Sequence, residues 1–414
     1  MVYYGNARPD TDRTERNSIM TEKTLGLYVH IPFCHSKCPY CDFYSDTDTA
    51  MASRYTEALL LHMEDYARAA AAHDVDTVFF GGGTPTVLPV SRLISILEGI
   101  EDTFTLRTDA EITVEANPAT VSLSELKRLR RAGVNRLSMG LQSANNDELA
   151  ALGRIHTFEE FADSFKAARK AGFRNISIDL MYGIPGQTLP SFRRTLEEVT
   201  ALEPEHISVY GLKIEEGTPF AARKDSLMLP DEDTESEMYF EAIRFLASAG
   251  YAQYEISNFA KPGKQCLHNL RYWNCEEYLG FGPGAHSYFG GRRFAFRRSI
   301  EDYVRAMEFP GSVSDLLSED YEIHPSERLG EYVMLRMRLT DGVDTDAFAA
   351  RFGVSFEKLF GKYLKLYGTN GFMEKYGRRW RFTPKGMYVS NYILSAMLDF
   401  DSDILNGIAD GSDR

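Results

Sequence analysis

The sequence predicts an α/β protein: an incomplete (β/α)6 barrel of the TIM type, followed by a smaller C-terminal α+β domain. Three observations support this prediction. Six short apolar segments alternate with amphipathic segments from residue 25 onward, as in parallel strands covered by helices. A glycine, proline or polar residue follows each apolar segment. Beyond residue 290 the alternation gives way to short helices and a hairpin.

The six apolar segments have the composition of buried parallel strands. Each is short and rich in branched or aromatic residues, which suits a strand covered on both faces. We therefore expect six strands in the order of the chain. They span residues 25–31, 76–80, 110–116, 135–140, 175–181 and 206–212.

The segments between the strands are expected to form helices, as residues 157–172 illustrate. Their phenylalanines recur at three- and four-residue steps, which places them on one face of a helix. Thr157 and Glu160 have the spacing of a capping box at the helix start. Gly172 stands where a helix ends in a left-handed residue. Ser122 with Glu125, and Gly133, give the same signals for the preceding helix.

The polar residues at strand ends favour a barrel over its main alternative, a doubly wound open sheet. Periodicity alone does not separate the two folds. In a barrel, however, the carboxyl ends of all the strands meet at one mouth, where sites are built. The residues at those ends are His30, residues 81–85, Glu115 with Asn117, Gln142, Asp179 and Lys213.

Composition and charge restrict the class of protein. The chain has 414 residues, of which 43% are hydrophobic and 26% charged, as in globular proteins. We expect residues 1–23 to form a flexible polar leader, and because it lacks the apolar core of a signal peptide we expect a cytoplasmic protein. No apolar run is long enough for a membrane span. The formal charge of −14 disfavours nucleic acid as a partner.

Three cysteines, Cys34, Cys38 and Cys41, follow the first predicted strand. In a cytoplasmic chain such closely spaced thiols indicate metal binding rather than disulfides. A structural zinc ion needs four ligands, so Cys266 or Cys275 would have to supply the fourth. An iron–sulfur cluster held by three thiolates instead keeps one iron open to a small molecule. We favour the cluster.

The Cys-x3-Cys-x2-Cys spacing resembles that of the radical S-adenosylmethionine (SAM) superfamily. The resemblance implies a radical SAM barrel in residues 24–290 and a [4Fe-4S] cluster on Cys34, Cys38 and Cys41. It also implies SAM bound to the open iron and an electron donor such as flavodoxin. It assigns SAM contacts to Tyr28, Gly82, Gly83, Thr84, Glu115, Gln142, Arg154 and Asp179.

These assignments suit the chemistry of the cofactor. The glycines would let the backbone approach SAM, and the amides of residues 82–84 would be offered to it. Glu115 would accept hydrogen bonds from ribose hydroxyls, and Arg154 would clamp a carboxylate. Gln142 and Asp179 would surround the cationic sulfonium with neutral and anionic groups.

Several longer motifs resemble the oxygen-independent coproporphyrinogen III oxidase group. That group has an oxidase branch, which decarboxylates coproporphyrinogen III in porphyrin biosynthesis, and a heme chaperone branch, which passes heme to respiratory proteins. The motifs are YVHIPFC (28–34), GGGTPT (81–86), IDLMYGIPGQT (178–188), EEGTPF (215–220) and HNLRYW (268–273), and the match extends over about residues 25–400.

Three features favour the chaperone branch. Phe43 stands where the oxidase carries a fourth cysteine, the segment ahead of the first strand is short, and residues 268–273 match the HNxxYW pattern of the chaperone. We therefore assign contact with heme or another porphyrin to His268, beside the flat side chains of Tyr272 and Trp273. Hydrogen bonding of His268 within the core is the alternative. The oxidase, and a nucleic-acid regulator, are the alternative functions.

The C-terminal domain, residues 291–414, is expected to be winged-helix-like. Helices are predicted at 326–339, 344–353 and 384–398, and a hairpin at 371–383 turns at Tyr376-Gly377. The resemblance implies that this domain covers the barrel mouth. The basic segment 375–386 is then an exposed hairpin with solvated charges.

Overall fold

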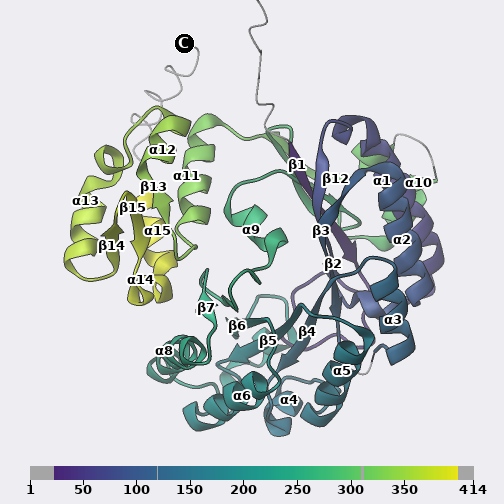
Figure 1. Ribbon diagram of the computed structural model, residues 1–414, viewed down its shortest axis with the longest axis horizontal. Coiled ribbons are helices and arrows are strands. Elements are labelled where there is room, and N and C mark those ends of the chain that lie inside the picture. The colour runs from purple at the N-terminus through teal and green to yellow at the C-terminus, as the bar shows by residue number, and fades with distance from the viewer. Residues whose placement is uncertain (1–22, 119, 309–311, 400–414) are drawn as a thin grey trace, which may run out of the picture.

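The computed structural model describes residues 23–118, 120–308 and 312–399. The leader predicted for residues 1–23 lies outside these ranges except for Lys23. Within them, the main sheet has twelve strands in the order β12-β11-β10-β9-β1-β2-β3-β4-β5-β6-β8-β7. Helices cover its outer side, and a smaller domain lies beside it (Figure 1).

The predicted six-unit barrel is confirmed. Its six strands pair in parallel in chain order. A doubly wound sheet would reverse its strand order at a switch point, whereas β1 to β6 follow one another without a reversal. The strands are β1 (Thr24–Ile31), β2 (Asp74–Gly82), β3 (Thr105–Ala116), β4 (Arg136–Gln142), β5 (Ile176–Tyr182) and β6 (His206–Gly211).

The barrel is incomplete because both of its edge strands pair with other segments. On one side β1 pairs in parallel with β9 (Tyr278–Phe281), and the sheet continues through β10 (His286–Phe289), β11 (Arg292–Phe296) and β12 (Leu317–Glu322). On the other side β6 pairs antiparallel with β8 (Asn258–Ala260), which pairs with β7 (Ala252–Gln253). Since β11 and β12 follow residue 290, the main sheet includes residues from both sides of the predicted domain boundary.

The helices of the barrel bury their apolar faces on this sheet. Phe161 and Phe165, the apolar face predicted for residues 157–172, are buried in the core. The helices are α1 (Ala52–Ala70), α2 (Val90–Thr103), α3 (Leu123–Arg131), α4 (Asn146–Ala151), α5 (Phe158–Ala171), α6 (Leu189–Ala201), α7 (Pro219–Ala222), α8 (Glu232–Ser248) and α10 (Ile300–Met307).

The capping box predicted for α5 is present. Thr157 Oγ1 accepts a hydrogen bond from Glu160 N, and the Glu160 carboxylate accepts one from Thr157 N at 2.9 Å. At the other end Gly172 has φ 100°. We expect Thr157→Ala to lower the free energy of unfolding by about 1 kcal/mol, and Thr157→Ser to change it by only a few tenths. Urea unfolding measures both, and equal losses would contradict the capping role.

The C-terminal domain has its own apolar core and a three-stranded sheet, in the order β13-β15-β14. The predicted hairpin is confirmed, with Gly377 at φ 59° in its turn. The single helix predicted at 384–398 is wrong, because the backbone leaves helical geometry at Val389. The elements are α11 (Pro325–Arg336), β13 (Val343–Asp344), α12 (Thr345–Phe352), α13 (Phe356–Thr369), β14 (Met373–Tyr376), β15 (Arg379–Phe382), α14 (Pro384–Tyr388) and α15 (Ser390–Leu398).

This domain packs against α8 and lies beside α9 (Leu267–Trp273), which separates it from the main sheet in Figure 1. The ring of Tyr388 lies 5.4 Å from that of Tyr239 on α8, centroid to centroid. Arg336 on α11 donates a hydrogen bond to Asn274, just after α9. The cavities described below are lined, among the described residues, from the barrel and α9, so a covering role for this domain stays a prediction.

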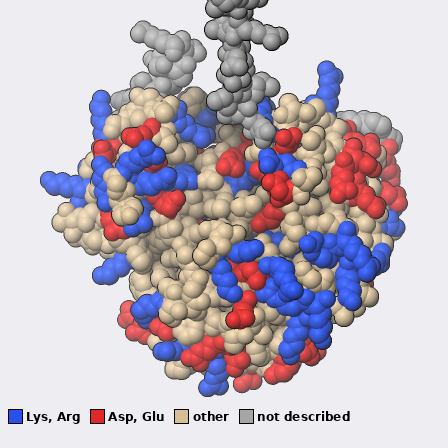
Figure 2. All heavy atoms as spheres, in the orientation of Figure 1, with Lys and Arg blue, Asp and Glu red and all other residues tan. Residues whose placement is uncertain are grey.

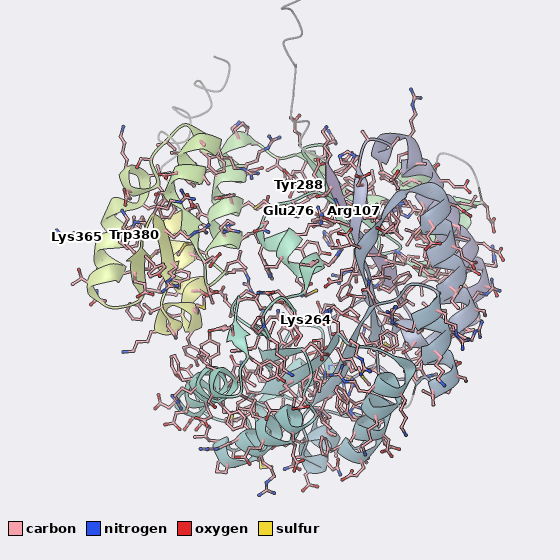
Figure 3. The ribbon with its side chains drawn as sticks, in the orientation of Figure 1. Arg107, Lys264, Glu276, Tyr288, Lys365 and Trp380 are labelled. Carbon is pink, nitrogen blue, oxygen red and sulfur yellow. The ribbon has the colours of Figure 1, made fainter. Side chains whose placement is uncertain are left out.

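The charges of the basic segment 375–386 are largely paired. Lys375 contacts Glu357, Arg378 contacts Asp344, and Arg381 contacts Glu374. Lys, Arg, Asp and Glu side chains accordingly lie side by side over this domain in Figure 2. Trp380, on its outer flank in Figure 3, donates its indole N–H to Glu357. No helix of the described chain combines the length and the apolar character that crossing a bilayer requires.

Candidate functional site

A cavity of about 610 Å³ lies at the carboxyl ends of the barrel strands. All six strands, or the loops that follow them, contribute to its lining, as the strand-end pattern predicts. The cavity brings together most of the predicted site residues. Those that line it are Cys34, Cys38, Cys41, Gly82, Gly83, Thr84, Glu115, Gln142, Arg154 and Asp179.

The three cysteines lie on a loop whose two ends are joined by backbone hydrogen bonds. Cys34 N donates to Asp46 O at 2.9 Å, and Asp46 N donates to Pro32 O at 2.8 Å. All three thiols are free and only partly exposed. Phe43, at the position of the oxidase's fourth cysteine, lines the same cavity and is 69% exposed.

The distant cysteines do not join this group. Cys266 is buried, and its thiol lies 3.6 Å from Glu111 Oε1. Cys275 packs against the C-terminal core. Neither lines the cavity that holds the other three. The structure therefore does not bring the fourth ligand of the zinc alternative to the site.

Asn117 connects two of the cysteines, although the sequence placed it only among the strand-end residues. Its amide Nδ2 donates to Thr84 Oγ1 at 2.7 Å, and that oxygen lies 3.6 Å from Cys34 Sγ. Its Oδ1 accepts from Arg154 Nη2 at 2.9 Å, and Arg154 Nη1 points at Cys38 Sγ at 3.6 Å. A chain of polar contacts thus runs from Cys34 to Cys38.

The glycines at the end of β2 allow the backbone to be approached closely, and in this structure the approaching group is the end of β1 and the loop after it. A Cβ on Gly83 would lie 2.6 Å from Phe33 O, so only glycine fits there. Gly83 N donates to Ile31 O, and Thr84 N donates to Phe33 O. In this structure these two amides therefore hold the start of the cysteine loop, and contact of Gly82, Gly83 and Thr84 with SAM stays a prediction.

Two acidic residues, Glu115 and Asp179, line both this cavity and a second one that adjoins it. Burial raises the pKa of Glu115 to about 8, with a further contribution from Asp179 and an opposing one from the Gly82 amide. Burial also raises the pKa of Asp179, opposed by hydrogen bonds from serines. Ser138 donates to both Asp179 oxygens, at 3.3 and 3.2 Å. Such carboxylates suit a cationic or hydroxyl-bearing ligand.

The pKa of Glu115 leads to a pH prediction for the protein without ligands. Between its ordinary pKa of 4.5 and about 8, the folded protein holds a proton that the unfolded chain has released. This contribution to stability is therefore lost as pH rises. Glu115→Gln has no carboxyl group at this position to release a proton, so it should not lose this stability. The free energy of unfolding of the variant minus that of wild type should therefore increase with pH across this window, by up to about 1.4 kcal/mol per pH unit. Urea unfolding of both proteins at several pH values measures it, and a pH-independent difference would contradict the assignment.

Gln142 ends β4 in a strained conformation. Its φ of 71° lies in the left-handed region, which non-glycine residues avoid unless the surroundings enforce it. Pairing with β5 shifts register between Gly140 and Gln142, and the irregularity lies where β4 lines the cavity. The strain is thus stored at the predicted site.

The other two predicted residues, Tyr28 and His268, line the second cavity, of about 210 Å³. His268 is 1% exposed. Its Nδ1 lies 2.9 Å from Thr77 Oγ1 and its Nε2 lies 2.8 Å from Tyr272 Oη, so both ring nitrogens are hydrogen-bonded. Burial lowers its pKa to about 3, which keeps the ring neutral. In this conformation neither nitrogen is open to a metal.

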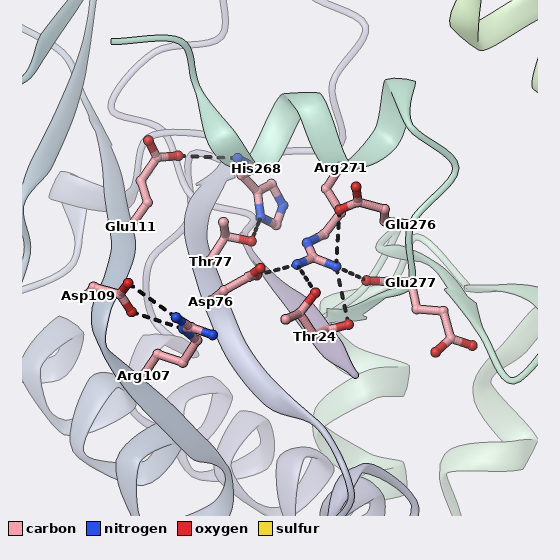
Figure 4. Close-up of polar contacts among 10 residues, drawn as sticks. All are labelled: Thr24, Asp76, Thr77, Arg107, Asp109, Glu111, His268, Arg271, Glu276 and Glu277. Carbon is pink, nitrogen blue, oxygen red and sulfur yellow. Dashed lines mark hydrogen bonds and ion pairs between the residues drawn. The ribbon is translucent and has the colours of Figure 1, made fainter. Parts of the chain in front are cut away.

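Arg271 anchors the helix that carries His268, which the sequence did not predict. Its guanidinium donates to the carbonyls of Thr24 and Glu277, at 3.3 and 3.0 Å, and contacts the carboxylate of Asp76 (Figure 4). Gly26 leaves the space, since a Cβ there would lie 2.5 Å from Arg271 Cδ. The motif HNLRYW is therefore held against the first two strands by its arginine.

Comparison with known proteins identifies the family to which the chain belongs. The sequence model of the Radical SAM superfamily matches residues 28–199, and that of the HemN C-terminal domain matches residues 323–389. The chain is 37% identical to the heme chaperone HemW of Bacillus subtilis (strain 168) over 90% of this chain and 99% of that protein. It is 35% identical to the heme chaperone HemW of Escherichia coli (strain K12), over 90% of this chain and 98% of that one.

Among solved structures, the chain is similar to coproporphyrinogen III oxidase (HemN) from Escherichia coli, described as a radical SAM enzyme. The TM-score is 0.80 and the sequences are 27% identical, with 91% of each chain covered. The structural likeness therefore covers the barrel and the C-terminal domain together. The chain belongs to the radical SAM superfamily and, within it, to the family of the heme chaperone HemW.

Proposed function

We propose that this protein is a heme chaperone that carries a [4Fe-4S] cluster and SAM at the barrel mouth and delivers heme to respiratory proteins. One observation carries the proposal. Cys34, Cys38 and Cys41 meet in a single cavity with the glycine and carboxylate residues of the neighbouring strands, in a chain that matches HemW relatives over nearly its whole length.

The donor set of the cavity fits an iron–sulfur cluster. Three free thiols share one cavity. Thr84 and Arg154 place donors toward two of the sulfurs. When bound and reduced, such a cluster supplies an electron to SAM, and we propose a flavodoxin-like donor for it.

The remaining residues of the cavity are proposed to bind SAM. Glu115 and Asp179 offer buried carboxyl groups to a cation and to hydroxyls, and Gln142 lines the same cavity from β4, the strand between theirs. Arg154 already bonds Asn117 and the Gly140 carbonyl, so its orientation is fixed before a carboxylate arrives. Tyr28 lies in the second cavity, next to Glu115, and its proposed contact is with the innermost part of the ligand.

The test of function is a heme titration paired with an oxidase assay on one anaerobic preparation. We expect one heme bound per chain and no conversion of coproporphyrinogen in the presence of SAM and reductant. Robust formation of protoporphyrinogen would overturn the chaperone proposal in favour of the oxidase. The cytoplasm is the proposed location, because its reducing conditions keep the five thiols free.

Heme contact by His268 stays a proposal, and the structure shows what it requires. One of the two hydrogen bonds of the ring must open, and α9 must expose the ring to a ligand larger than the second cavity. If His268 ligates heme, His268→Ala weakens heme binding by about tenfold or more and leaves iron and sulfide content unchanged. The matched control is His206→Ala, because His206 lines the same cavity outside the HNxxYW motif. Unchanged heme affinity in the His268 variant would remove this residue from the site.

A further inference from the structure

We infer that Asn117 is a positioning residue that sets the hydrogen bonding of two cluster thiolates at once, and through them the reduction potential of the cluster. The inference rests on the proposed function, since it concerns the cluster proposed there. Asn117 itself touches neither sulfur. It acts through Thr84 toward Cys34 and through Arg154 toward Cys38.

The first arm fixes the direction of a hydroxyl hydrogen. Asn117 Nδ2 donates to Thr84 Oγ1 at 2.7 Å, so this oxygen acts as an acceptor toward the amide. The hydroxyl hydrogen of Thr84 is then free to point at Cys34 Sγ, 3.6 Å away. Thr84 is 3% exposed, which leaves little water to compete for the hydroxyl. Without the amide, the hydroxyl can rotate away from the sulfur.

The second arm fixes the plane of a guanidinium. Arg154 Nη2 donates to Asn117 Oδ1 and to Gly140 O, both at 2.9 Å. Its Nη1 then faces Cys38 Sγ at 3.6 Å. Arg154 Nε is buried without a hydrogen-bond partner among the described residues. The orientation of the guanidinium therefore depends on Asn117 and one backbone carbonyl.

Only an amide side chain serves both arms at this position. Asparagine offers a donor and an acceptor on one short planar group, whereas aspartate lacks the donor and leucine lacks both. The backbone holds the residue in place, because Asn117 O accepts hydrogen bonds from Thr120 N and Thr120 Oγ1.

The physical consequence follows from the charge of the cluster. Reduction adds an electron to a group that is already rich in negative charge. Hydrogen bonds and cationic groups directed at its sulfurs stabilise the reduced state more than the oxidised one, and so raise the potential. Asn117 aims one neutral donor and one cationic donor at two of the three thiolates. Its removal should therefore make the cluster harder to reduce.

The test is an anaerobic redox titration of the reconstituted protein, followed by electron paramagnetic resonance (EPR) of the reduced cluster. We expect Asn117→Leu to move the midpoint potential to a more negative value at unchanged iron and sulfide content. Thr84→Val, which removes one arm only, should cause a smaller shift in the same direction. In the Asn117→Leu background, Thr84→Val should change the midpoint potential less than it does in wild type. The reason is that, without the Asn117 amide, the Thr84 hydroxyl is no longer directed at Cys34.

Asn135→Leu is the matched control. Asn135 is also a part-buried amide with two hydrogen bonds, to Ile112 N and Ala110 O. It lies just before β4, at the end of that strand away from the cavity, and its variant should keep the wild-type potential. An unshifted potential in Asn117→Leu, or equal effects of Thr84→Val in both backgrounds, would overturn the inference. Loss of iron from both Asn117→Leu and Asn117→Ala would assign Asn117 a purely structural role and overturn it too. A wild-type protein without a cluster would instead refute the proposed function.

Discussion

Replacing Cys38 with serine is expected to abolish the binding of iron and sulfide by this protein. The three thiolates are the proposed cluster ligands in a cavity to which no further cysteine contributes, and an alcohol does not replace a thiolate as a ligand for iron–sulfur clusters. Anaerobic reconstitution followed by iron and sulfide analysis measures the loss. Arg154 also loses its sulfur partner in this variant.

Cys275→Ser is the control for that experiment. Cys275 is also a free cysteine, but it packs against the C-terminal core and lies outside the cavity. Its variant should keep the full content of iron and sulfide. Normal cluster content in Cys38→Ser, or equal losses in the two variants, would contradict the assignment of the cavity as the cluster site.

Arg271→Ala is expected to cause a large loss of stability, about 3–5 kcal/mol in the free energy of unfolding. Arg271 is 2% exposed, and its guanidinium bonds two carbonyls and the hydroxyl of Thr24 besides the carboxylate of Asp76. Removing it leaves that carboxylate without its partner and the carbonyls without their donors. It also releases α9 from the first two strands. Urea unfolding measures the change.

The matched control for Arg271 is another arginine of the same region. Arg107 pairs with Asp109 at 2.9 Å, but the two side chains are 35% and 71% exposed, and both are drawn in Figure 4. Pairs at this exposure contribute about 0–1 kcal/mol, so Arg107→Ala should be nearly neutral. Comparable losses in the two variants would show that burial does not decide the contribution of Arg271.

The sequence predicted the barrel and much of the candidate site because both depend on repeated local signals. Strand composition and capping residues located β1 to β6 and α5, and strand-end residues such as Glu115 and Asp179 do meet in one cavity. The spacing of the cysteines pointed to the superfamily, which the comparisons confirm. Each of these signals lies within a few neighbouring residues of the chain.

What the sequence could not predict depends on contacts between distant segments. The amides of Gly83 and Thr84 bond the last residue of β1 and the loop after it, a pairing set by the register of two strands. Asn117 meets Thr84 and Arg154 only because the ends of β2 and β3 and the loop after α4 converge. The sequence analysis assigns no role to the arginine of HNLRYW, yet Arg271 is buried against β1 and β2. Buried polar groups that are hydrogen-bonded by distant segments do not recur at a regular interval in the sequence, so hydrophobic periodicity does not predict them.

The central claim is that this cavity holds a four-iron cluster with one iron open to SAM. Purified wild-type protein, reconstituted without air, should contain about four iron and four sulfide per chain. After reduction, its EPR spectrum should change when SAM is added, because the ligand reaches the cluster itself. Zinc in place of iron and sulfide, or a reduced spectrum indifferent to SAM, would contradict the account.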